Sequence, residues 1–155
     1  MYEGKGIDRN EFEECFTHTE GRVEYELGAK PKLGSDSSDF DKSDCSGYSR
    51  WMLSRTLDGF TDDIPDGSAN QHAWCSDNLT AALYYDALQD RTNAIFVAFM
   101  DQNPATEEVT RHVWFVQNGA TIECCGGDGV CSSQQHAELY SNRVSGCYHI
   151  PGYLE

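Results

Sequence analysis

The sequence predicts an α+β domain in which helices come first and a small antiparallel sheet follows. Three observations carry this prediction. Helical spacing and helix caps dominate before residue 85, apolar strand candidates begin at residue 94, and an Asn-Gly pair joins two of those strands. The chain has 155 residues and no long linker, so residues 1–155 are expected to form a single domain.

The helical part divides into three stretches. Residues 7–27 carry apolar side chains at helical spacing and are expected to form one amphipathic helix or two short ones. Residues 29–43 are rich in Gly, Ser, Asp and Pro, which is typical of a loop. A second helix is expected over residues 44–58, because Ser and Asp precede it as good N-caps. Residues 70–85 are expected to form one or two short helical turns.

The strand candidates are apolar runs separated by turn residues, at 94–100, 110–117, 120–124 and 147–150. Asn118–Gly119 separates the second run from the third and is a strong signal for a two-residue hairpin. In that hairpin Gln117 pairs with Ala120, and Trp114 lies opposite Glu123. The sequence therefore predicts the register as well as the strands.

Composition excludes several classes of partner. The chain has 11 Lys and Arg against 26 Asp and Glu, a formal net charge of −15, so a nucleic-acid partner is not expected. No apolar run is long enough to cross a membrane, so no membrane partner is expected either. The N-terminal stretch lacks the basic-then-apolar layout of a secretion signal. We expect a monomer that is made in the cytoplasm and acts outside it, after release by a phage or by a non-classical route.

A cysteine at the predicted start of the second helix is the strongest candidate for chemistry. Cys45 follows the capping residue Asp44, so its thiol would lie near the positive end of the helix dipole and near unpaired backbone N–H groups. Both features favour the thiolate, which is the nucleophilic form. The alternative is a buried cysteine that packs in the core.

The predicted hairpin supplies a base and an acid for this nucleophile. Strand alternation places His112 on the same face as Trp114, and Glu123 lies diagonal to His112 on the neighbouring strand, within side-chain reach. A carboxylate there would hold the imidazole in one tautomer and stabilise its charged form. The alternative for His112 is a core histidine with satisfied hydrogen bonds. If the first interpretation holds, Cys45, His112 and Glu123 form a papain-type triad.

The same residues resemble a known family. Residues 44–48, Asp-Cys-Ser-Gly-Tyr, resemble the D-C-S-G-[FY] nucleophile signature of the NlpC-type papain-like cysteine peptidases, which cut bacterial cell-wall peptides. Residues 25–28 are similar to the family's Y-x-W-G segment, with Leu27 in place of the tryptophan. Residues 112–119 resemble its H-V…N-G hairpin.

Three further positions bear on the resemblance. Ile64-Pro65, with Gln71 six residues on, resembles the stretch beyond the nucleophile helix. Arg111 stands where a glycine usually precedes the family histidine. Glu123 occupies the place of the third triad member, which is more often His, Asn or Gln.

The resemblance implies a papain-like, NlpC-type domain that acts as a cell-wall hydrolase. It would be a cysteine endopeptidase or amidase that cleaves peptidoglycan stem peptides through a thioester and needs no cofactor. Cys45 would be the nucleophile, His112 the base and Glu123 the orienting residue. The candidates for oxyanion and substrate binding are Tyr25, Asp44, Ser46 and Gln71.

The expected biological setting is a phage lysin or a tail-associated enzyme. Two alternatives stay open at this stage. One is a catalytically silent module that binds peptidoglycan on the same scaffold. The other is an injected antibacterial amidase toxin, or an acyltransferase that resolves the same thioester with another acceptor.

A second cluster of cysteines lies late in the chain. Cys124, Cys125 and Cys131 with His136 have the residue types of a zinc site, but they lack a C-x-x-C pair and adjacent cysteines rarely bind one metal together. No metal is therefore expected, and disulfides among these three cysteines and Cys147 are favoured instead.

Overall fold

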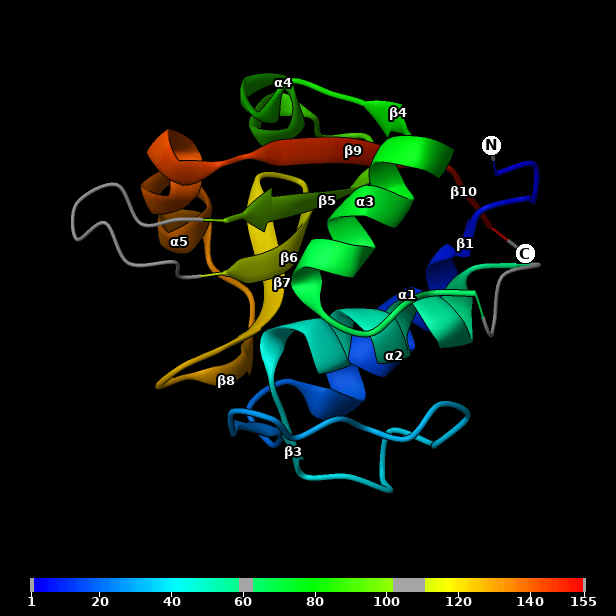
Figure 1. Ribbon diagram of the computed structural model, residues 1–155, viewed down its shortest axis with the longest axis vertical. Coiled ribbons are helices and arrows are strands. Elements are labelled where there is room, and N and C mark those ends of the chain that lie inside the picture. Colours follow the sequence, from blue (N-terminus) through cyan, green and yellow to red (C-terminus); the bar gives the residue numbers. More distant parts are fainter. Residues whose placement is uncertain (1, 59–62, 102–110, 155) are drawn as a thin grey trace.

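The structure is a computed structural model that describes residues 2–58, 63–101 and 111–154. Its centre is a six-stranded sheet with the strand order β4-β9-β5-β6-β7-β8, in which every pairing is antiparallel (Figure 1). The strands are β4 (Thr80–Ala81), β5 (Ile95–Met100), β6 (His112–Gln117), β7 (Ala120–Cys125), β8 (Gly129–Cys131) and β9 (Gly146–Ile150).

Five helices accompany this sheet in the described residues: α1 (Arg9–Thr19), α2 (Cys45–Thr56), α3 (Ser68–Asn78), α4 (Tyr84–Gln89) and α5 (Gln134–Leu139), which a short 3-10 turn extends to Arg143. Two small parallel pairs complete the fold. They join β1 (Ile7–Asp8) to β10 (Gly152–Tyr153), and β2 (Glu24–Tyr25) to β3 (Lys42–Ser43). The predicted order, helices first and antiparallel strands later, is confirmed.

The hairpin between β6 and β7 has the predicted register. Gln117 pairs with Ala120, and Phe115 pairs with Ile122. Asn118 and Gly119 have φ angles of 52° and 79°. A tight two-residue hairpin turn requires positive φ at both central positions, and Asn-Gly is the pair that adopts it most readily.

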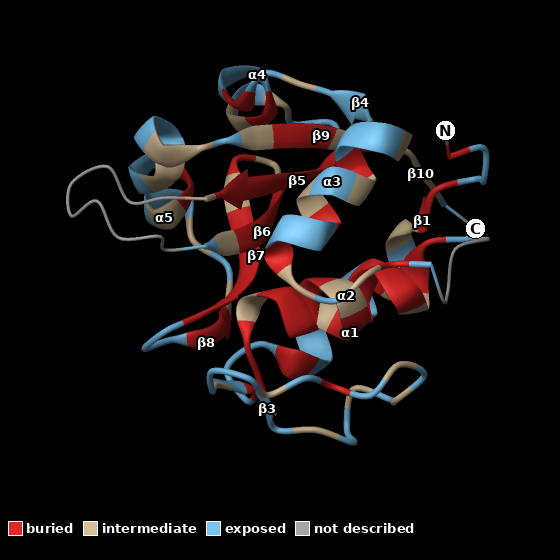
Figure 2. Ribbon diagram, viewed as in Figure 1, coloured by how far each residue is buried: buried red, intermediate tan, exposed pale blue. Residues whose placement is uncertain are grey.

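The central sheet separates two apolar cores. Along β6, Val113 and Phe115 face the core formed with α1 and α2, whereas Trp114 and Val116 face the core formed with α4. This alternation follows from the two-residue period of a strand. Figure 2 shows the result: β5 is buried throughout, while α3 turns an exposed face to solvent. The sequence predicted that His112 and Trp114 share one face of the hairpin, and this face is the α4 side of the sheet.

The first and third helical stretches differ from the prediction. α1 spans only Arg9–Thr19, because Gly21, with a φ of 71°, turns the chain so that Val23 enters the core and β2 follows. Residues 68–89 form α3, the short strand β4 and α4, in place of one or two helical turns. β8 and α5 were not predicted, since each is too short to show a clear period. No helix among the described residues combines the length and apolar character that a membrane span needs.

Candidate active site

The nucleophile candidate Cys45 is the first residue of α2, as predicted. Asp44 caps this helix: its Oδ1 accepts a hydrogen bond of 2.7 Å from the amide of Gly47. The amides of Cys45 and Ser46 belong to the first turn, where the helix offers no acceptor of its own. The start of α2 therefore presents the Cys45 thiol together with N–H groups that are available to an oxyanion.

The glycine of the Asp-Cys-Ser-Gly run has a steric cause. A Cβ atom at Gly47 would lie 3.0 Å from the carbonyl oxygen of Ala29 and 3.1 Å from Cδ of Pro31. The preceding loop thus crosses directly over the first turn of α2. The same Cβ would meet the capping oxygen Asp44 Oδ1 at 2.9 Å, so a larger residue here would disturb the cap of α2 as well as the loop.

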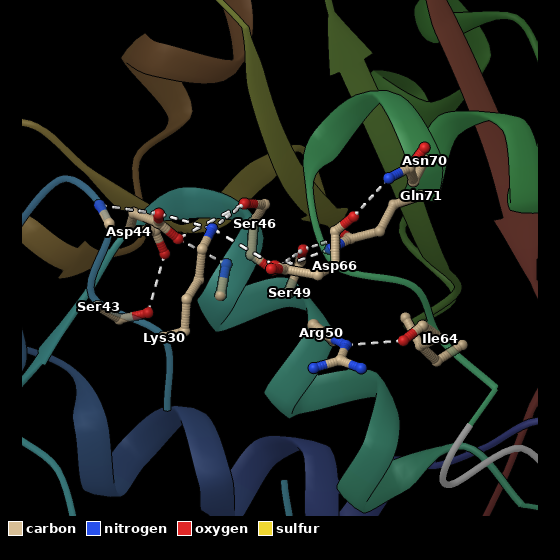
Figure 3. Close-up of polar contacts among 12 residues, drawn as sticks. Lys30, Ser43, Asp44, Ser46, Ser49, Arg50, Ile64, Asp66, Asn70 and Gln71 are labelled. Carbon is tan, nitrogen blue, oxygen red and sulfur yellow. Dashed lines mark hydrogen bonds and ion pairs between the residues drawn. The ribbon is translucent and has the colours of Figure 1, made fainter. Parts of the chain in front are cut away.

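Lys30 ties this loop to the start of α2 (Figure 3). Its Nζ lies 2.7 Å from Asp44 Oδ2 and donates a 2.7 Å hydrogen bond to Ser46 Oγ. Asp44 Oδ2 also accepts from the amide of Gly28 at 3.2 Å. Asp44 and Ser46, both expected near substrate, lie beside Cys45, and Lys30 binds both of them. Nothing in the sequence pattern singled out Lys30.

Gln71 belongs to α3, points toward the first turns of α2 in Figure 3 and is 2 % exposed. Its amide nitrogen donates to the Ser46 carbonyl at 3.0 Å, and its amide oxygen accepts from Ser49 Oγ at 2.5 Å. Both ends of the side chain are thus used to hold α2 in place. These contacts favour a positioning role for Gln71 over the direct substrate contact that the resemblance implied.

His112 and Glu123 form the predicted pair. His112 Nε2 lies 2.9 Å from Glu123 Oε1, and the Glu123 side chain is completely buried. Burial by itself lowers the pKa of His112. Hydrogen bonds to Cys45 and Glu123, and the negative charges of these groups, outweigh that effect and raise the pKa to about 9. With Nε2 engaged by Glu123, Nδ1 is the ring nitrogen available to Cys45.

Two further side chains bind Glu123. The Tyr140 hydroxyl donates to Oε1 at 2.7 Å, and His136 Nδ1 lies 3.1 Å from Oε2. Burial by itself raises the pKa of Glu123, but the hydrogen bonds, that from His112 above all, hold it well below its usual range. Sequence reasoning did not place His136 and Tyr140 here. Their spacing of four residues, which puts both on one face of a short helix, was the available signal.

Aromatic rings hold the histidine in its plane. The His112 ring stacks on Trp114 with the centroids 5.3 Å apart and the planes at 19°, and Tyr140 contacts it edge-on. Trp114 Nε1 in turn donates to the Tyr84 hydroxyl at 3.2 Å. The His112 ring therefore has a fixed orientation, with the Glu123 carboxylate on one side.

Two cavities meet at Cys45. One, of about 470 Å³, extends toward α5 and includes His112, Arg143 and Asp128 in its wall. The other, of about 320 Å³, is bounded by Lys30 and by the start of α3. Tyr25, Cys45 and Arg111 line both cavities. Burial, and next the negative charge of Cys45, raise the pKa of Tyr25, so its hydroxyl remains a proton donor beside the nucleophile.

The expected disulfides are absent: all seven cysteines lie within the described residues and all are free thiols. Strand alternation turns Cys124 and Cys125 to opposite faces of β7. Cys124 Sγ donates to the Ser43 carbonyl at 3.3 Å, on the side of α2. Cys125 Sγ lies 3.7 Å from Cys131 Sγ, which is too far for a disulfide bond.

Comparison with known proteins bears on the fold. No family model matches the sequence, and no curated protein matches it. Among solved structures, NlpC1 from Trichomonas vaginalis matches 99% of this chain with a TM-score of 0.56 and 19% identity. The chain has the NlpC-type papain-like fold. It covers 48% of the NlpC1 chain, about half its length. The resemblance drawn from the sequence motifs is confirmed at the level of the fold.

Proposed function

We propose that this protein is a cysteine hydrolase that cleaves amide bonds in the stem peptides of peptidoglycan. The observation that carries the proposal is the convergence of three side chains on one cleft: Cys45 at a helix start, His112 beside it, and Glu123 behind His112. The NlpC-type fold supports the choice of the cell wall as the substrate class.

In the proposed reaction each of these residues has a step. His112 Nε2–H donates to Glu123, so Nδ1 accepts the proton of the Cys45 thiol. The thiolate attacks the carbonyl carbon, and the oxyanion that forms accepts a hydrogen bond from the Cys45 amide and one from the Tyr25 hydroxyl. The imidazolium then protonates the leaving amine, and a thioester remains. Water, deprotonated by His112, hydrolyses the thioester and restores the thiol.

The shape and charge of the cleft support an extended peptide as substrate. Cys45 lies where the two cavities meet, so residues on both sides of the scissile bond have space. Arg111 and Arg143 line the larger cavity and supply positive charge for the carboxylates of a stem peptide. Both features favour an endopeptidase, which cuts within a peptide.

The alternative on the same scaffold is a silent binding module. The intact contacts among Cys45, His112 and Glu123 argue against it, because a module that only binds has no need of a histidine placed between a thiol and a buried carboxylate. The phage-related setting stays a prediction of the sequence.

The test is a digest of purified peptidoglycan with the wild type and with Cys45→Ala, followed by mass spectrometry of the soluble fragments. We expect new peptide fragments from the wild type only, and their masses identify the bond. If both proteins are silent but sediment with the insoluble wall, the binding module replaces the hydrolase. If both are silent and neither binds, the cell wall is not the substrate.

A further inference from the structure

A second cluster of polar side chains lies behind the triad, on the wall of the larger cavity. It consists of Glu123, Cys125, Cys131 and His136, and one ligand atom from each lies within 4.8 Å of the others. Glu123 and Cys125 are buried, and the other two are partly buried. We propose that these four residues bind a zinc ion.

Three features of the fold bring the four residues together: strand alternation, the β7–β8 register and the attachment of α5 to β7. Strand alternation puts Glu123 and Cys125 on the same face of β7, and the β7–β8 register places Cys131 directly opposite Glu123. The start of α5 is fixed to β7 by two hydrogen bonds of 3.1 Å between Thr121 and Ser133. Ser133 also caps α5 by accepting from the amide of His136, so the imidazole lies over Glu123.

Two of the ligand–ligand distances are close to those of a tetrahedral zinc site, and all the ligand atoms lie within 4.8 Å of one another. With Zn–S of about 2.3 Å, tetrahedral angles place two thiolates about 3.8 Å apart. Cys125 Sγ and Cys131 Sγ are 3.7 Å apart. With Zn–N and Zn–O of about 2.1 Å, a nitrogen and an oxygen ligand lie about 3.4 Å apart. His136 Nδ1 and Glu123 Oε2 are separated by 3.1 Å.

The donor set suits zinc and makes the site structural. Two thiolates, an imidazole and a carboxylate are ligands that zinc accepts, and four protein ligands leave no open position for substrate or water. The remaining ring nitrogen of His136 lies 3.8 Å from Asp128 Oδ2. A carboxylate behind a metal-bound histidine commonly orients the ring and fixes its tautomer.

Binding is balanced in protons. Each thiol loses one proton, so two protons are released for each zinc ion bound. Binding through Nδ1 requires His136 to carry its ring proton on Nε2, which faces Asp128. Glu123 gives Oε2 to the metal and keeps Oε1 for His112 and Tyr140. The zinc ion and the triad therefore use different oxygen atoms of one carboxylate, and neither displaces the other.

The identity of the fourth ligand, Glu123, explains why the sequence did not predict this site. Cys124 faces the other side of β7 and takes no part, which removes the pair of adjacent cysteines that argued against zinc. Glu123 takes the place of Cys124. The site does not depend on the proposed hydrolysis.

The test measures the metal content of the full chain purified under reducing conditions without chelator. We expect one zinc ion per chain. After removal with a chelator, cobalt(II) should restore one equivalent and give the absorption of a tetrahedral, thiolate-bound ion. Cys125→Ser, Cys131→Ser and His136→Ala should lose the bound metal. Cys75→Ala, which removes a buried thiol on α3 that does not belong to the cluster, should retain it.

A competition titration of the wild type against a chromophoric chelator keeps the test decisive if a variant does not fold. The wild type should withdraw one equivalent of zinc, and its melting temperature should rise with zinc. Less than half an equivalent of zinc in reduced wild type, or zinc retained by the folded Cys125→Ser and Cys131→Ser proteins, would overturn the proposal. A Cys125–Cys131 disulfide in protein isolated without reductant, together with no zinc uptake after reduction, would overturn it too. None of these measurements uses peptidoglycan, so they stand or fall apart from the hydrolase.

Discussion

Removing the Tyr140 hydroxyl probes the buried network that holds Glu123. That hydroxyl donates to Glu123 Oε1 at 2.7 Å, and the same oxygen is 2.9 Å from His112 Nε2. Because the Glu123 side chain has no exposed surface, water has no ready access to replace the lost donor. Tyr140→Phe keeps the ring, whose centroid lies 4.6 Å from that of Trp114, so packing is retained.

The size of the effect follows from the charge on the acceptor. A hydrogen bond to a charged group contributes about 1.5–3 kcal/mol to the free energy of unfolding. The low pKa of Glu123 keeps its carboxylate charged at neutral pH, so this range applies. For a chain of this length each kcal/mol changes the melting temperature by about 2–4 °C. We therefore expect Tyr140→Phe to lower it by about 3–12 °C.

Circular dichroism, with chelator present to keep metal out, measures both differences: urea unfolding gives the free energy and thermal unfolding gives the melting temperature. The matched control is Tyr85→Phe, which deletes the same atom from a side chain that is 71% exposed and should change the free energy by less than about 0.5 kcal/mol. If the two variants are equally stable, the Tyr140 hydroxyl does not bind a buried carboxylate, and the closed network around Glu123 is wrong.

Three further predictions concern the same cleft. Glu123→Gln keeps the shape of the side chain but removes its charge. Because His112 loses its orienting partner, we expect kcat on stem peptides to fall by about 10²–10⁴-fold. An unchanged kcat would show that Glu123 is not part of the triad. In metal-free wild type the pKa of His112 is raised from the ordinary value of 6.5 to about 9. His112 carries the proton that it gives to the leaving amine only below this pKa. The rate of hydrolysis should therefore fall as the pH rises through about 9. A pH–rate profile tests this. In Glu123→Gln the rate should fall at a lower pH than in the wild type. If it falls at the same pH in both proteins, the pKa does not belong to His112. Gln71→Leu leaves the Ser46 carbonyl and the Ser49 hydroxyl without their partner. It should lower the free energy of unfolding by about 1–3 kcal/mol for each group and change KM little. A large rise in KM at unchanged stability would show that Gln71 contacts the substrate.

The sequence predicted those parts of the site that local rules determine. An Asp before Cys45 predicts a capped helix start, and the structure has one. Asn118–Gly119 predicts a two-residue turn, and the turn alone determines which residues of β6 and β7 lie opposite one another. The proximity of His112 and Glu123 follows from that register, which is why a pair eleven residues apart was predictable.

Other parts of the site depend on contacts between residues far apart in the sequence, which local sequence patterns do not predict. Tyr140 meets Glu123 only because α5, six residues long, folds back over β7. Lys30 lies in a loop without a periodic pattern, and its partners are determined by where that loop crosses α2. The disulfide prediction failed for a different reason. It rested on the number and clustering of the cysteines, whereas strand alternation turns Cys124 away from Cys125, and Cys125 Sγ and Cys131 Sγ are 3.7 Å apart.

The crossing of the loop over α2 couples the cleft wall to the helix start that carries Cys45. Asp44 holds the amide of Gly28 through one oxygen and that of Gly47 through the other, and Lys30 lies against both Asp44 and Ser46. The loop also forms part of the wall of the smaller cavity. A substrate that displaced this wall would have to uncap α2 and shift Cys45 at the same time. This side of the cleft is therefore held in place by the same contacts that cap α2 and position Cys45.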